Sequence, residues 1–90
     1  MADKTSTSFT LVDASPDFIR LSGSVIITIA TVFSYSWVKY IHWNGTGTAQ
    51  INPNGRTFMY NGVDQSGLFN LTSNFYMIVC INDNIVMRSL

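Results

Sequence analysis

The segment Val25–Trp43 alternates large and small side chains along nineteen residues. Its odd positions carry most of the Ile, Phe, Tyr and Trp residues, and its even positions carry mainly smaller ones. A period of two places the large side chains on one face of a β-strand. Because a strand usually has about five or six residues, we expect a break or bulge near Ser34–Ser36. An unbroken segment would instead form a long strand of the kind found in intertwined assemblies.

The composition favours strands along the whole chain. Nine Ile, seven Val and nine Thr are β-branched, and twelve further residues are aromatic. These residue types fit a pleated sheet better than a helix. Glu, a good helix former, is absent. A mostly helical fold is therefore not expected.

Turn-forming residues separate several other short apolar runs. The clearest turn signals are Asn44–Gly47, Asn52–Gly55, Asn61–Gly62 and Asn82–Asn84, where Asn, Gly and Pro suit tight turns. Further strands are expected at Phe9–Val12, Asp17–Leu21, Thr48–Ile51, Arg56–Tyr60, Leu68–Leu71, Phe75–Ile81 and Ile85–Arg88.

Two of these segments carry additional expectations. Ser15 and Pro16 could instead begin a short helix that ends at Gly23. The near-continuous apolar run Phe75–Ile81 is typical of a strand buried on both faces. About eight short strands predict an all-β fold, mostly antiparallel, in a small sandwich or jelly-roll-like barrel.

The length allows one domain. Residues 1–8 are polar and predict an N-terminal arm, and residues 9–90 predict a single β domain. Cys80 is the only cysteine, so no intrachain disulfide framework is possible, and its apolar neighbours predict a buried thiol. The N-terminus lacks the basic and apolar regions of a signal peptide. We therefore expect cytoplasmic synthesis.

Charge and motif content argue against several functions. Formal net charge is zero and only 11% of residues are charged, so a basic nucleic-acid-binding surface is not expected. His42 and Cys80 are single representatives of their types and do not make a zinc site. No nucleophile elbow or phosphate loop is present, and Asp64 and Asp83 lie in predicted turns. We predict no catalytic residues, no metal and no cofactor.

Aromatic residues gather before the Gly-rich turn and at the end of another strand. The residues that could contact a ligand or a partner are Trp37, Tyr40, Trp43, Asn44 and Tyr60. Exposed aromatic rings beside Asn side chains suit either sugar stacking or a protein interface. Core or interface positions are expected for Phe9, Phe18, Phe33, Tyr35, Trp37, Phe58, Phe69, Phe75 and Tyr76.

The hypothesis that best fits these observations is a non-catalytic assembly protein. Few charges and much apolar content suggest that neighbouring copies or other subunits cover the surface. A virus or phage particle component, such as a decoration, vertex, fibre or tail protein, would have this character. It would reside in a virion or another extracellular assembly, with edge strands or the arm adding across chains.

Two alternatives belong to other classes. One is a carbohydrate-binding module or lectin-like domain, with Trp43, Asn44 and Tyr60 near the sugar. The other is a small membrane protein that uses the uncharged residues 21–38 as a helix. The many Ser, Thr and β-branched residues in that run argue against a membrane helix.

Overall fold

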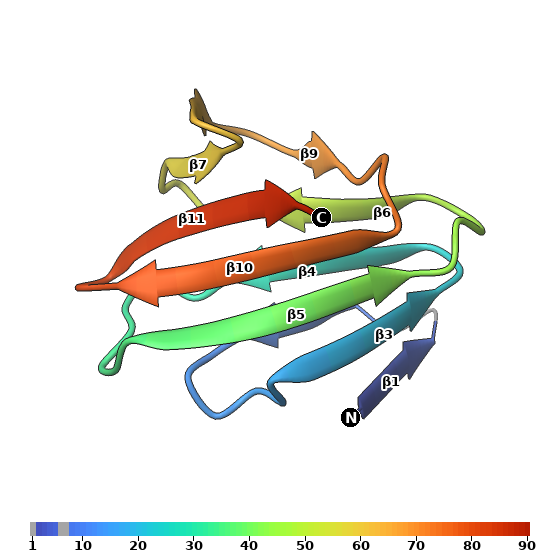
Figure 1. Ribbon diagram of the computed structural model, residues 1–90, viewed down its shortest axis with the longest axis horizontal. Coiled ribbons are helices and arrows are strands. Elements are labelled where there is room, and N and C mark those ends of the chain that lie inside the picture. Colours follow the sequence, from blue (N-terminus) through green and yellow to red (C-terminus); the bar gives the residue numbers. More distant parts are fainter. Residues whose placement is uncertain (1, 6–7) are drawn as a thin grey trace.

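A computed structural model describes residues 2–5 and 8–90, with side chains from residue 8 onward, as two packed β-sheets (Figure 1). Sheet A contains, in spatial order, β1 (Ala2–Thr5), β3 (Phe18–Ser22), β5 (Trp37–Trp43), β10 (Phe75–Ile81), β11 (Asn84–Ser89), β7 (Phe58–Tyr60) and β8 (Val63–Gln65). Sheet B contains β2 (Phe9–Leu11), β4 (Val25–Ile29), β6 (Ala49–Asn52) and β9 (Phe69–Asn70). The prediction of an all-β, sandwich-like fold is confirmed.

The N-terminal half of the chain winds between the two sheets. Odd-numbered strands β1, β3 and β5 enter sheet A, and β2, β4 and β6 enter sheet B, so that neighbours within each sheet are parallel. Like residues stack along this winding: Ile19 lies beside Ile41 and Ile27 beside Ile51. All four side chains are fully buried between the sheets, where apolar burial is the main stabilising contribution.

The C-terminal half closes sheet A with antiparallel strands. β10 pairs with β5 on one side and with β11 on the other. Asn82 and Asp83 join β10 to β11 with positive φ angles of 50° and 65°. Positive φ at both central residues is what a two-residue hairpin requires, and Asn and Asp tolerate it better than most residues.

Strand orientation is therefore mixed, whereas a mostly antiparallel arrangement was predicted. The reason is that alternation reveals which face of a strand is buried but not which strand lies beside it. In the N-terminal half, each parallel pair is linked by a crossover that is itself a strand of the other sheet, and β7 adds a further parallel pair with β11. The predicted division of Val25–Trp43 is confirmed, because residues 30–36 separate β4 from β5.

Other expectations are resolved segment by segment. Residues 18–22 form a strand rather than the alternative helix, and Cys80 is a buried free thiol whose pKa burial raises. Residues 2–5 of the expected arm form β1, while residues 1, 6 and 7 lie outside the described part. A strand at 63–65 was not expected.

The expectation that Phe75–Ile81 is buried on both faces is wrong. Tyr76, Ile78 and Cys80 face the core and are fully buried, but Phe75 and Ile81 are exposed. Sheet B covers only one side of sheet A, so the other side of β10 has no layer over it. An apolar sequence thus produces an apolar outer surface.

Candidate interaction surface

The outer side of sheet A, turned toward the viewer in Figure 1, forms a largely apolar surface, which we call the sheet A face. Strand register places residues from five strands on it: Phe18, Arg20, Val38, Tyr40, His42, Met59, Phe75, Met77, Val79, Val86 and Arg88. Seven of these side chains are wholly apolar, and Tyr40 and His42 add two more rings. Such a surface on a small domain is typical of an interaction site.

Cross-strand pairing organises this face into rows. One row runs through Phe18, Tyr40, Met77 and Arg88, each opposite the next on its neighbouring strand. The rings of Phe18 and Tyr40 lie 6.4 Å apart. In the adjacent row, the rings of His42 and Phe75 are stacked at 4.5 Å. Directly opposed aromatic pairs of this kind stabilise a sheet.

The outer side of sheet B has a different character. Its outward side chains are Thr10, Ile26, Thr28, Gln50, Asn52 and Asn70. Apart from Ile26, these are neutral polar residues, and Gln50 donates to Asn70 at 2.8 Å. The two outer surfaces of the sandwich thus differ. The outer side of sheet B is polar, with a hydrogen bond between its own side chains, whereas the outer side of sheet A is largely apolar and carries two arginines.

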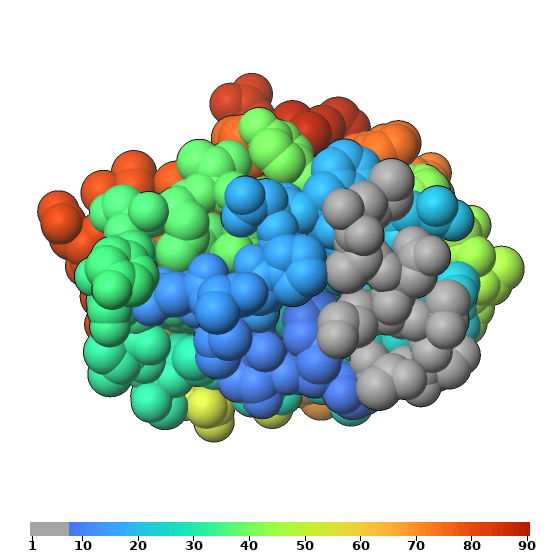
Figure 2. Space-filling view, turned by 90° about the horizontal axis from the view of Figure 1, so that it is seen from below, coloured from blue at the N-terminus to red at the C-terminus, as the bar shows by residue number. Residues whose placement is uncertain are grey.

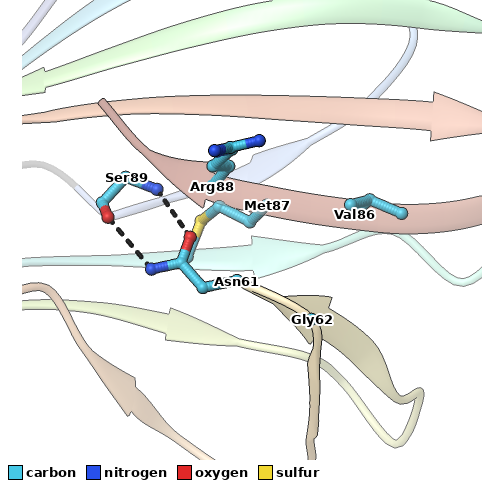
Figure 3. A pocket seen from close by; sticks show the side chains of 6 residues that line it. All are labelled: Asn61, Gly62, Val86, Met87, Arg88 and Ser89. Carbon is cyan, nitrogen blue, oxygen red and sulfur yellow. Dashed lines mark hydrogen bonds between the residues drawn. The ribbon is translucent and has the colours of Figure 1, made fainter.

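A hollow lies where the sheet A face meets the β7–β8 hairpin (Figure 3). It is lined by Asn61, Gly62, Val86, Met87, Arg88 and Ser89, and its volume is about 490 Å³. That volume lies within the range of roughly 300–1,000 Å³ of pockets that hold small ligands.

Asn61 ends the pairing between β7 and β11 and shapes this hollow. Its side chain donates to Ser89 Oγ at 3.0 Å and accepts from the Ser89 N–H at 3.1 Å. Both polar ends of Asn61 are thereby occupied. Arg88, in contrast, has no hydrogen-bond or ion-pair partner among residues 8–90, so it is the group available to a ligand or partner.

A buried lysine fixes the loop between β2 and β3. Lys39 is only 1% exposed, and its ammonium donates to the backbone carbonyls of Asp13 and Ser15. It also lies 3.3 Å from the exposed Asp17 carboxylate and 4.9 Å from the Trp37 ring centroid. Three acceptors match the three donors of the ammonium, which makes burial of the charge tolerable.

Two carboxylates hold the loop between β4 and β5, residues 30–36, which we call loop 30–36. Asp13 accepts from the Ser34 N–H at 2.7 Å, and Asp83 accepts from the Phe33 N–H at 2.8 Å. Figure 2 shows the blue segment after residue 8 lying against the blue-green residues of this loop. Successive amides of one loop are thus bonded by residues seventy positions apart in the chain.

Aromatic and cationic contacts complete the support of this loop. Phe33 is buried and meets the Trp37 ring edge-on at 5.2 Å. The Arg56 guanidinium lies 5.2 Å from the Phe33 ring centroid and also bonds Asp83. The Phe33 N–H and, secondarily, Arg56 hold the pKa of the Asp83 carboxyl below its ordinary value.

The lowered pKa of Asp83 gives a pH prediction. A carboxyl with a depressed pKa in the folded state stabilises the fold above its unfolded pKa, and this stabilisation is lost as the pH falls through the folded value. The free energy of unfolding should therefore decline below about pH 4. Denaturant titrations across this range should show a shallower decline for Asp83→Asn. Parallel pH profiles for the two proteins would contradict the assignment.

The structure separates the five residues expected to form a site. Trp37 and Trp43 lie at opposite ends of β5 on its core-facing side, and each indole N–H is bonded, to Asp13 at 2.9 Å and to the Thr46 carbonyl at 3.1 Å. Tyr60 packs on Phe69. Asn44 is exposed in a turn, and Tyr40 alone belongs to the sheet A face.

Sequence reasoning missed most of the sheet A face. The signal was the apolar character of both faces of Phe75–Ile81, together with Phe18, Val38 and Tyr40 at positions opposite the core-facing set. These residues become neighbours only through the order of β3, β5, β10 and β11 in the sheet.

The chain matches no known protein-family model, and no curated protein or solved structure resembles it significantly. Within residues 2–5 and 8–90, no helix is long and apolar enough to span a bilayer. The residues 21–38 of the membrane hypothesis form parts of β3, β4 and β5 instead. In the same described part, no three His, Cys or Asp residues are grouped as metal ligands.

Proposed function

We propose that this chain is a non-catalytic assembly protein whose sheet A face is covered by another copy of the chain. The observation that carries the proposal is the apolar outer side of sheet A, set against the polar outer side of sheet B. A face that only met water would gain nothing from exposed Phe18, Tyr40 and Phe75.

Regular geometry supports a protein partner over a small ligand. The sheet A face spans the strands from β3 to β7, and its side chains come from rows that the ladder holds in register. Broad apolar surfaces with aromatic residues and arginine are typical of the centre of protein interfaces. The formal net charge of zero also favours self-association, because little electrostatic repulsion opposes the approach of identical copies.

The setting that we propose is a virus or phage particle or another extracellular assembly. This part of the proposal rests on composition: Glu is absent, charges are few, and Ser, Thr and Asn are abundant. Symmetric particles cover apolar faces of their subunits with neighbouring subunits.

A matched pair of lysine substitutions tests the proposal. Val86 on the sheet A face and Ile26 on the outer side of sheet B are both 37% exposed. We expect Val86→Lys to abolish self-association, because it places a second cation beside Arg88 in the contact. Ile26→Lys should assemble like the unmodified chain. Light scattering on a sizing column gives the mass of each protein.

Circular dichroism checks that both variants keep their strand content. A monomeric unmodified chain would refute the proposal, as would equal assembly of the two lysine variants. In either case the carbohydrate alternative becomes the next hypothesis to test. A glycan titration of intrinsic fluorescence, repeated with Trp43→Ala, would then decide it.

A further inference from the structure

Loop 30–36 carries two apolar side chains that no other described part of the chain covers. Tyr35 is 73% exposed and Val32 is 70% exposed, the highest values among the large apolar side chains of residues 8–90. Between them, Phe33 points inward and is buried, and the amides of Phe33 and Ser34 are bonded to carboxylates. The loop therefore holds Val32 and Tyr35 outward on a fixed base.

This support favours a contact surface over a simple connection. A flexible loop loses conformational entropy when a partner orders it, and that loss weakens binding. Here Asp13, Asp83 and the edge-on contact between Phe33 and Trp37 order the loop before any partner arrives. Rigid aromatic anchors of this kind contribute most of the binding energy in many interfaces.

We infer that loop 30–36 of one copy docks on the sheet A face of the next copy, with Tyr35 in the hollow beside Arg88. This inference rests on the proposed function and specifies its contact. The hollow, at about 490 Å³, can accommodate an aromatic side chain. Its apolar lining comes from Val86, because Met87 is fully buried and faces the core.

Charge complementarity selects this occupant. Asp13 and Asp83 lie directly against loop 30–36. Asp83 is already paired with Arg56, whereas Asp13 has no ion-pair partner among residues 8–90. On the sheet A face, Arg88 has no partner among residues 8–90 either. Docking would bring Asp13 of one copy toward Arg88 of the next, whereas two sheet A faces packed together would bring their Arg88 side chains toward each other.

The contact joins two different surfaces, and this determines the kind of assembly. When a patch on one copy meets another patch on the next, repetition gives a closed ring or an open filament. Face-to-face packing of identical patches would instead give a two-fold dimer. The two arrangements respond differently when variants are mixed.

The test mixes two defective proteins. The double variant Val32→Ser and Tyr35→Ser lacks the docking side chains but keeps its sheet A face, and Val86→Lys lacks the face but keeps the loop. Each alone should be monomeric. An equimolar mixture should form a dimer of one chain of each kind, because only one of the possible contacts is intact.

The control removes side chains of similar exposure elsewhere. Val63 and Leu68 are 60% and 59% exposed, and the double variant Val63→Ser and Leu68→Ser should assemble like the unmodified chain. A mixture that stays monomeric, or a loop variant that assembles normally, would overturn the docking inference while leaving the proposed function intact. A monomeric unmodified chain would overturn both.

Discussion

Replacing Lys39 by methionine should lower the free energy of unfolding by roughly 2–4 kcal/mol, measured by denaturant titration. The reason is that the carbonyls of Asp13 and Ser15 lose their donor, and each partly buried acceptor left without a partner costs about 1–3 kcal/mol. Methionine has a similar shape, so loss of packing contributes little to the change.

The matched control for Lys39 is Asp17→Asn. Asp17 is largely exposed where it meets the ammonium, and exposed ion pairs contribute only about 0–1 kcal/mol. We expect the methionine variant to be clearly less stable than the asparagine variant. Equal stabilities would mean that water replaces the lysine at both carbonyls.

Replacing Phe33 by alanine should destabilise the fold by about 3–5 kcal/mol, the range found for buried phenylalanine. The substitution removes the edge-on contact with Trp37 and the ring that faces Arg56. It also removes the side chain that anchors loop 30–36, so self-association should fall even at temperatures where the fold persists. Thermal unfolding and light scattering measure the two effects separately.

Phe33→Leu separates anchoring from core volume. Leucine fills most of the space and leaves the backbone bonds from Asp13 and Asp83 in place, so both stability and assembly should lie between those of the alanine variant and the unmodified chain. An alanine variant that assembles as well as the unmodified chain would show that the anchor has no part in the contact.

Much of the strand content could be predicted because alternation and turn chemistry are local. The core-facing side of β4 and β5, for instance, follows directly from the odd positions Val25, Ile27, Ile29 and Ile41. The parallel pairing of these strands could not be predicted, because the number of residues between one strand and its partner changes from one turn of the winding to the next. Phe9 and Ile27 pair across eighteen residues of sequence, and Ile27 and Ile51 across twenty-four. No sequence period signals such a winding.

The candidate surface was less accessible to sequence reasoning than the fold. The aromatic cluster around Trp37 and Trp43 suggested a site, yet both indoles face inward with their N–H groups bonded. What decides exposure is whether a second layer covers a given side of the sheet. Hydrogen-bond acceptors can also allow an unexpected residue to be buried, as the backbone carbonyls around the Lys39 ammonium do.

The place of β10 between β5 and β11 has a consequence for how the protein is made. During synthesis, residues 75–81 leave the ribosome long after β5, the strand on which they must pair. Until then one edge of β5 has no neighbouring strand, and sheet A lacks the strands that complete it. Pairing between segments so distant in sequence is intrinsically slow, and unpaired strand edges can join to another chain in the meantime. Nascent copies on neighbouring ribosomes could thus meet through their edges before any one of them has completed its own sheet.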